Sequence, residues 1–277
     1  MKSKFYSLAG LRLRVDSESK IADSRLYADF YAPEGDCDVR VRVTEGPLPE
    51  KKGRLMSRNE WREYYDDNGE LILYSLYPRM AGPYTFACRE GTGAEIGLTV
   101  DNPEGMWDAM LFHALNIPEL TARRGFFQLH CSYIIFRGEA VLFSADKGVG
   151  KSTQAALWEK HRGAEIVNGD RALLHLTENG LTAYGTPYCG SSDIALNRAA
   201  PVKAVVLLSQ GDRNLLELCR GTEPFLRILG QLTFEPYQNQ DAVDFTLGVC
   251  SRVPVYSLQC LAEESAVSLL ETTLWKA

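Results

Sequence analysis

The chain has 277 residues, of which 45% are hydrophobic and 24% are charged, and its formal net charge is −6. This is the composition of an ordinary globular protein, and the acidic balance excludes the broad basic surface typical of nucleic-acid binding. No uncharged apolar run approaches the roughly 18 residues of a membrane span, so no membrane partner is expected.

Residues 1–101 are predicted to form a β-rich N-terminal domain. Polar and apolar residues alternate in short runs that Gly, Pro and Asp separate. Period-two alternation predicts antiparallel strands with one solvated face. The clearest runs are residues 11–15, 39–43, 71–77 and 95–100. No catalytic cluster is visible in this part, which favours a scaffold or docking module.

Residues 102–277 are predicted to form an α/β nucleotide-binding domain, which makes the whole chain α+β. Helices are expected at 103–115, with Pro103 in the first turn, and at 118–124. Two strands, 127–136 and 140–143, lead into a loop that a helix at 154–160 follows. The later elements are strands at 165–170, 172–176, 202–208 and 253–258 and helices at 223–232, 241–250 and 262–274.

The segment between that strand and that helix is the most informative part of the chain. It fits the phosphate-binding pattern G-x-x-x-x-G-K-[ST] except at the first position, where Ala145 replaces glycine. Alanine fits there if its φ is negative. Small residues let backbone N–H groups converge on phosphate, and the helix N-terminus adds donors and a positive dipole end. The alternative is a chance Gly-Lys-Ser turn, which the strand and helix on either side disfavour.

The pattern assigns roles within the loop. Lys151 is expected to neutralise the β- and γ-phosphates, and the Ser152 hydroxyl is expected to coordinate Mg²⁺. The residues expected to bind ATP are Ala145, Asp146, Lys147, Gly148, Val149, Gly150, Lys151, Ser152 and Thr153.

Phosphoryl transfer also needs a carboxylate at a neighbouring strand end, to hold the metal or to accept the hydroxyl proton. Asp170 ends the run 165–170 and fits this role, although an Asp after a Gly is also a common turn residue. His130 lies in an otherwise apolar strand, where a histidine is more often a core residue. Arg198, beside Asn197, could clamp phosphate or be a surface cation.

The cysteines bear on the compartment. There are seven, and none forms a C-x-x-C pair, so a zinc site is not expected. The odd count, and an N-terminal segment interrupted by Arg12, Arg14 and Asp16, argue for reduced thiols and against secretion. We therefore expect a cytoplasmic protein.

These residues together resemble the HPr kinase/phosphorylase-like branch of P-loop proteins, which shares its nucleotide core with the phosphoenolpyruvate carboxykinases. The order of His130, the loop, Arg162-Gly163 and Asp170 is that of the family, and the resemblance is strong over residues 129–208. Other features shared with a group of bacterial HPr-kinase-like proteins are Trp158, residues 184–190, Asn197, Pro201 and residues 253–256.

The resemblance implies an HPr-kinase-like nucleotide-binding core with ATP and Mg²⁺ as cofactors. It implies that His130, Lys151 and Asp170 are active-site residues and that Ser152 and Asp170 contact the metal. Some relatives phosphorylate serine on a peptide, which implies a peptide or protein phosphoacceptor. Relatives are often oligomeric, so a homo-oligomer stays open.

The sequence also departs from the family. Gly169 stands where the family has the first Asp of an acidic pair, and the Glu-x-Arg-Gly signature tied to phosphoserine hydrolysis is not visible. The leading hypothesis is therefore an ATP-dependent kinase of a Ser or Thr hydroxyl that is not a phosphorylase. The alternatives are a nucleotide-binding regulatory or assembly module without transfer, and a kinase of a small hydroxylated metabolite.

Overall fold

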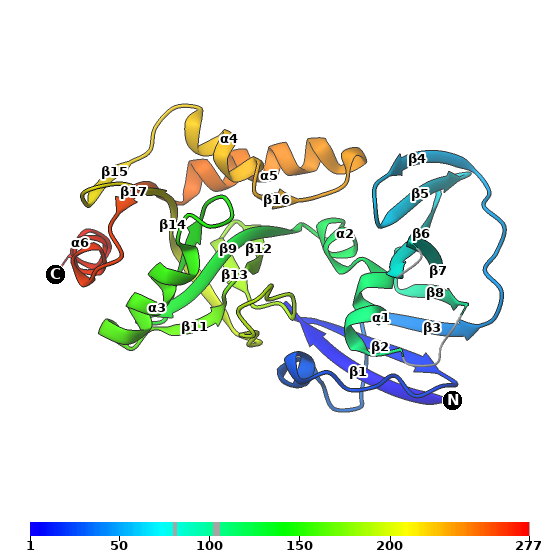
Figure 1. The fold of residues 1–277 in the computed structure, drawn as a ribbon. Helices are drawn as coiled ribbons and strands as arrows, with labels where there is room; N and C mark the ends of the chain where they lie inside the picture. The colour runs from blue at the N-terminus through cyan, green and yellow to red at the C-terminus, as the bar shows by residue number, and fades with distance from the viewer. Residues whose placement is uncertain (80–81, 102–105, 277) are drawn as a thin grey trace. The chain divides into compact units, whose positions relative to one another are not determined.

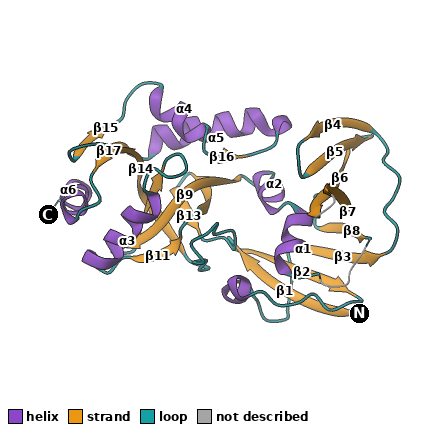
Figure 2. Cartoon of the chain, in the orientation of Figure 1, coloured by secondary structure: helices purple, strands orange, loops and turns teal. Residues whose placement is uncertain are grey.

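The computed structural model describes residues 1–79, 82–101 and 106–276, and it is a mixed α/β structure with two sheets (Figure 2). The chain divides into two compact units. The first comprises Met1–Leu120 together with Glu235–Tyr237, and the second comprises Thr121–Phe234 and Gln238–Ala277. Within the described ranges, no helix is long and apolar enough to cross a membrane.

The first unit is built on an eight-stranded sheet in the order β1-β2-β3-β8-β7-β6-β5-β4. Its strands and one 3₁₀ helix are β1 (Lys2–Leu8), β2 (Leu11–Ser17), η1 (Arg25–Phe30), β3 (Val39–Glu45), β4 (Arg54–Arg58), β5 (Arg62–Asp67), β6 (Glu70–Arg79), β7 (Gly82–Glu90) and β8 (Glu95–Val100). The four predicted strands lie within β2, β3, β6 and β8. One face is buried, as the alternation predicted: Val39, Val41 and Val43 of β3 are all in the core.

The expectation of a wholly antiparallel sheet is wrong. Strand β3 runs parallel to both β2 and β8, whereas the other neighbours are antiparallel. Period-two burial shows which face of a strand is covered, but it does not report the direction of the neighbouring strand. The hairpin β5–β6 does carry a local signal, because Asn68 and Gly69 both have positive φ, 57° and 88°, as a two-residue turn requires.

Helices α1 (Asp108–Leu115) and α2 (Ile117–Ala122) follow the sheet. The helix predicted at 103–115 is observed from Asp108 onward, and its first residues, with Pro103, lie outside the described residues. Asn116, in the left-handed conformation at φ 49°, separates the two helices. Helix α1 packs on β6 and β7, and the division between the units falls after Leu120, whereas the sequence placed the boundary after residue 101.

The second unit holds a nine-stranded sheet with helices on both faces (Figure 1). Its strands are β9 (Phe126–Phe136), β10 (Glu139–Ser144), β11 (Glu165–Asn168), β12 (Arg171–Thr177), β13 (Gly180–Tyr184), β14 (Ala199–Gln210), β15 (Leu215–Leu218), β16 (Leu232–Thr233) and β17 (Val255–Cys260). Its helices are α3 (Lys151–Arg162), α4 (Glu223–Leu229), α5 (Asn239–Arg252) and α6 (Glu264–Leu274), and the 3₁₀ turn η2 (Pro236–Gln238) precedes α5.

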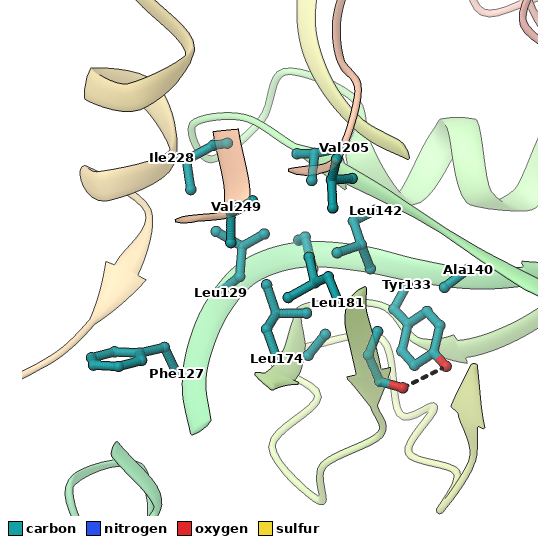
Figure 3. Packing of buried hydrophobic residues seen from close by; sticks show 14 of the residues in the cluster. Phe127, Leu129, Tyr133, Ala140, Leu142, Leu174, Leu181, Val205, Ile228 and Val249 are labelled. Carbon is teal, nitrogen blue, oxygen red and sulfur yellow. Dashed lines mark hydrogen bonds between the residues drawn. The ribbon is translucent and has the colours of Figure 1, made fainter. Parts of the chain in front are cut away.

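Strand β10 shows how the two faces are covered. Ala140 and Leu142 pack into a core with residues of α4 and α5, part of which Figure 3 shows. The alternate residues Val141 and Phe143 pack into a second core with Trp158 of α3 and with α6. A strand that is apolar on both sides is the expected form for a strand buried between two helical layers. In the first of these cores, the Tyr133 hydroxyl donates to the Ala183 carbonyl at 3.1 Å.

The strand pairing brings separate segments to one edge of the sheet. Strand β14 pairs antiparallel with β13 and parallel with β10, so the path β10-β9-β12-β13-β14 closes into a ring. Ser144, the last residue of β10, pairs with Cys131 of β9, and Arg171 pairs with His130. His130 is therefore placed between the start of the loop and the turn that carries Asp170.

Several predicted bounds shift by a few residues. The strand predicted at 165–170 ends at Asn168, and the strand predicted at 253–258 is β17. The helix predicted at 223–232 ends at Leu229, and the chain then forms the two-residue strand β16 beside β9. That short strand is important for the site described below.

Candidate functional site

The loop between β10 and α3 depends on two glycines. Gly148 and Gly150 have φ of 86° and 121°, and a Cβ at either would meet no atom within 4 Å. Their requirement is therefore conformational, because only glycine adopts such angles without strain. Ala145 is not among the residues with positive φ, so alanine is accommodated at the first position of the pattern.

The N-terminus of α3 is open toward this loop. Gly150 is the N-cap residue, and no side chain caps the first turn. Ser152 and Thr153 are exposed there. The first N–H groups of a helix have no partner within the helix, and together with the dipole they favour an anion. The last turn is basic, with Lys160, His161 and Arg162, which suits the opposite end of the dipole.

Lys151 is folded back into the loop. Its side chain is largely buried, with the residue only 7% exposed. The ammonium donates to the carbonyl oxygens of Ala145 at 2.9 Å and Asp146 at 3.3 Å. Burial lowers the pKa of Lys151, and the charge of Asp170 opposes that effect. An ammonium has three N–H donors, so these carbonyls leave the loop lysine with donor capacity toward a bound anion.

Asp170 faces His130 across the turn after β11. The distance from its Oδ1 to His130 Nε2 is 3.3 Å, and Arg171 Nε lies 3.1 Å from its Oδ2. The hydrogen bond with His130 lowers the pKa of Asp170, and the charges of Arg171 and Lys151 add to this against the opposing effect of burial. Asp170 is therefore an ionised carboxylate at neutral pH, and a quarter of its side chain is exposed.

Asn168 organises the turn that presents this carboxylate. Its buried side-chain oxygen accepts from the backbone N–H groups of Asp170 and Arg171, both at 2.8 Å. Its amide donates to the carbonyls of Thr186 at 2.7 Å and Tyr188 at 3.0 Å. A fully satisfied buried amide of this kind fixes the backbone on both sides of Gly169.

Gly169 cannot be replaced by an acidic residue without rearrangement. A Cβ there would lie 2.3 Å from Ser192 Cβ and 2.6 Å from Ser192 Oγ. The Ser192 hydroxyl is itself held by the Cys189 carbonyl at 2.7 Å. Ser192 therefore occupies the space that an acidic side chain at position 169 would need.

These groups line one cavity of about 620 Å³, within the size range of sites for small ligands. Its lining residues are His130, Lys147, Gly148, Gly150, Lys151, Ser152, Thr153, Gly169, Asp170, Arg171, Cys189, Gly190, Ser191 and Ser192. The predicted residues His130, Asp170, Lys151 and Ser152 thus share one cavity, and Lys147 lines it too. Ala145, Asp146 and Val149 of the loop line a second recess.

Other residues singled out from the sequence lie outside this lining. Arg162 binds Glu271 at 2.5 Å and Glu264 at 3.0 Å, which ties α3 to α6. Arg198 lies 3.5 Å from Glu165 at the start of β11. Both arginines therefore serve ion pairs within the unit rather than this cavity.

The sequence reasoning assigned no role to Arg171, Ser192 or Gln231, all of which lie at the site. Gln231, just before β16, contacts His130 Nδ1 through its Oε1 at 2.9 Å and donates from Nε2 to Asp146 Oδ1 at 2.9 Å. It lies inside the helix predicted at 223–232, whereas the observed α4 ends at Leu229. A two-residue strand leaves no periodic pattern, so the sequence held no signal for this contact.

The donor chemistry fits a magnesium nucleotide. Asp170 and Ser152 supply oxygen donors on the same cavity, which Mg²⁺ prefers. Over the ranges that the structure covers, no group of three or more His, Cys, Asp or Glu side chains could hold a metal ion. A metal here would rely on phosphate oxygens and water for its remaining ligands, as is usual for Mg²⁺.

Comparison with known proteins gives little further information. No protein-family model matches the chain, and no curated protein matches it. Among solved structures, part of the chain is similar to the Hpr(Ser) kinase/phosphatase from Coxiella burnetii, with 16% sequence identity and a TM-score of 0.32. The match covers 52% of this chain and 86% of that one. We base no assignment on so distant a neighbour.

Proposed function

We propose that the protein is an ATP- and Mg²⁺-dependent kinase that transfers the γ-phosphate to a Ser or Thr hydroxyl of a peptide or protein. The observation that carries the proposal is a shared cavity. It joins the open N-terminus of α3, the loop lysine Lys151 and the ionised carboxylate of Asp170. Phosphoryl transfer needs these three elements, because its catalysis is mostly positioning and charge stabilisation.

The phosphate-binding part of the mechanism belongs to the loop. Backbone N–H groups at the start of α3 and the Lys151 ammonium would bind the phosphate oxygens. Ser152 and Asp170 would hold Mg²⁺, which supplies further charge neutralisation when bound. Lys151 already lies inside the loop at the carbonyls of Ala145 and Asp146, so its third N–H is the donor left for the phosphate.

The transfer step would take place beside Asp170. The acceptor hydroxyl oxygen forms a bond to the γ-phosphorus while the bond from that phosphorus to the bridging oxygen of ADP breaks. The hydroxyl proton passes to the Asp170 carboxylate, which is ionised and therefore able to accept it. His130, whose Nε2 lies 3.3 Å from that carboxylate, would orient it for this step.

A nucleotide-binding regulatory module is the second candidate, and the environment of Gly169 favours it. Ser192 fills the space of a second carboxylate, so Asp170 would serve both metal and hydroxyl. If one carboxylate is insufficient for both roles, the cavity binds Mg-ATP without transfer. This alternative makes the same binding prediction as the kinase and differs only in turnover.

The test measures binding and turnover in the same samples. Thermal unfolding is followed with and without Mg-ATP, for the wild type, for Lys151→Ala and for Lys160→Ala, a control on the exposed last turn of α3. Ligand at about 100 times its dissociation constant adds about 2.7 kcal/mol of stability. We expect this stabilisation in the wild type and in Lys160→Ala, and we expect Lys151→Ala to lose most of it.

Turnover is measured with radiolabelled ATP and a degenerate mixture of Ser- and Thr-containing peptides. Label incorporated into peptide by the wild type but not by Lys151→Ala supports the kinase. Stabilisation by Mg-ATP without incorporation supports the regulatory module. Equal stabilisation of Lys151→Ala and the wild type contradicts both candidates, because the loop would then not be the phosphate site.

A further inference from the structure

Gln231 is joined to His130 through both its main chain and its side chain. Strand β16 pairs antiparallel with β9 immediately after this residue, and the backbone N–H of His130 donates to the Gln231 carbonyl at 2.9 Å. The Gln231 side-chain oxygen lies 2.9 Å from His130 Nδ1. The main-chain contact fixes the backbone position of Gln231, so its side chain reaches the ring with little conformational freedom.

The other end of the same amide determines which atom faces the ring. Asp146 is an acceptor, so the Gln231 group that contacts it at 2.9 Å is the NH₂. The amide oxygen therefore faces His130 Nδ1, and Nδ1 must carry a hydrogen for the two to bond. The second ring nitrogen, Nε2, faces Asp170, so Gln231 and Asp170 compete for the ring hydrogen whenever the ring carries only one.

A continuous series of contacts thus runs from the nucleotide loop to the acid, through Asp146, Gln231, His130 and Asp170. Asp146 lies next to Ala145, whose carbonyl holds Lys151. A change in the loop position would move Asp146 and, through the amide, the imidazole ring. The Asp146 contact is exposed, so its energy is small, and its effect is on orientation rather than on stability.

We propose that Gln231 is a positioning residue that keeps the hydrogen of His130 on Nδ1 and couples the ring orientation to the nucleotide loop. It does not touch the reacting atoms and acts through His130. The effect on phosphoryl transfer rests on the proposed kinase function, whereas the effect on the ring is a property of the protein without nucleotide.

The first experiment uses ¹⁵N NMR of the histidine side chains at one pH near 8, with no nucleotide present. Gln231→Met keeps the length of the side chain and removes both polar groups. Gln210→Met is the matched control, because Gln210 donates to the loop carbonyl of Gly148 at 3.4 Å and does not contact His130. A His130→Gln sample identifies the signals, and thermal unfolding checks that each variant folds.

We expect the larger share of the ring hydrogen to be on Nδ1 of His130 in the wild type and in Gln210→Met. In Gln231→Met the hydrogen should be distributed over both nitrogens, because Asp170 alone then binds the ring and draws it to Nε2. An unchanged His130 signal in Gln231→Met overturns the proposal. So does an equal change in Gln210→Met, which would indicate a general disturbance of the loop.

The second experiment adds Mg-tripolyphosphate, which can occupy the loop without a nucleoside. We expect the His130 signals to shift in the wild type and to shift much less in Gln231→Met. In the kinase assay, Gln231→Met should lower kcat on the order of 10-fold while KM for ATP stays within about twofold. Bound tripolyphosphate with equal His130 shifts in both proteins overturns the coupling. If the wild type binds no phosphate at all, the proposed function fails, and the apo spectra still decide the positioning of the ring.

Discussion

Two aspartates show how differently the two units use a carboxylate. Asp108 in the first unit is fully buried, and it accepts from Lys4 at 2.5 Å, Tyr31 at 2.5 Å and Tyr6 at 2.6 Å. Asp170 in the second unit is a quarter exposed, has longer contacts of 3.1 and 3.3 Å, and faces a cavity. The first carboxylate is saturated by its own unit, whereas the second keeps the capacity to bind something else.

The histidines repeat this contrast. His113 of α1 is held between the Arg62 guanidinium at 3.3 Å and the Leu76 carbonyl at 3.2 Å. Because arginine can only donate, Nδ1 of His113 is an acceptor and the ring is neutral. His130 instead bridges Gln231 and the cavity-facing Asp170. Asp108 and His113 are therefore bonded within the first unit, whereas His130 and Asp170 stay partly exposed to the cavity.

The largest expected effect separates activity from stability at Asp170. Asp170→Asn keeps the size and removes the proposed proton acceptor, so the proposed phosphoryl transfer should fall by about 10²- to 10⁴-fold. Unfolding in urea should change by less than about 1 kcal/mol, because the side chain is partly solvated. Asp193→Asn, on the exposed loop nearby, is the control and should retain the activity. A wild-type rate in Asp170→Asn would remove this residue from the mechanism.

The reverse outcome is expected at Asp108. Asp108→Asn leaves the Lys4 ammonium and two tyrosine hydroxyls around a neutral group, and the loss of a buried charge partner costs about 3–5 kcal/mol. The matched control is Asp23→Asn, because Asp23 binds the same ammonium at 2.8 Å but is 65% exposed, and such pairs contribute less than about 1 kcal/mol. Urea unfolding measures both. Equal effects of the two substitutions would show that burial does not distinguish them.

The next effect concerns pH and the first unit. Burial, followed by the charge of Arg62, lowers the pKa of His113 to about 4. Between pH 6.5 and 4, His113 is protonated in the unfolded chain but stays neutral in the folded chain. The free energy of unfolding therefore falls as the pH drops through this window, and the loss is complete below pH 4. The loss should be roughly 3 kcal/mol. His113→Gln, which cannot titrate, should have a flatter stability profile over this window, and an unchanged slope would contradict the assignment.

The smallest of these effects tests whether Ser192 occupies the space beside Gly169. Gly169→Ala places a methyl group against Ser192 and should cost about 1–3 kcal/mol. Adding Ser192→Gly removes the clashing atoms, so the double variant should be less destabilised than the sum of the two single variants. Strict additivity in urea unfolding would show that the two positions do not meet.

The sequence predicted local structure more accurately than it predicted strand pairing and contacts between distant residues. The strand, loop and helix around Lys151 are short-range features, and the predicted order is observed in β10 and α3. The parallel pairing of β3 could not be read from its alternation, because burial of one face is the same for either direction. Ser192 and Gln231 reach the site from distant parts of the chain, and neither is marked by a motif. Placing them requires the pairing of β16 with β9 and the fold of the loop 190–192.

The chain passes between the units more than once, because Glu235–Tyr237 belongs to the first unit although both its flanks belong to the second. This short segment supplies Glu235, which accepts from the Tyr64 hydroxyl at 2.6 Å, and Tyr237, whose ring lies 5.7 Å from that of Tyr64. A fragment that stops at Leu120 would lack both groups. The first unit is therefore discontinuous in the amino-acid sequence. Expressing residues 1–120 alone would leave the buried Tyr64 hydroxyl without the Glu235 carboxylate.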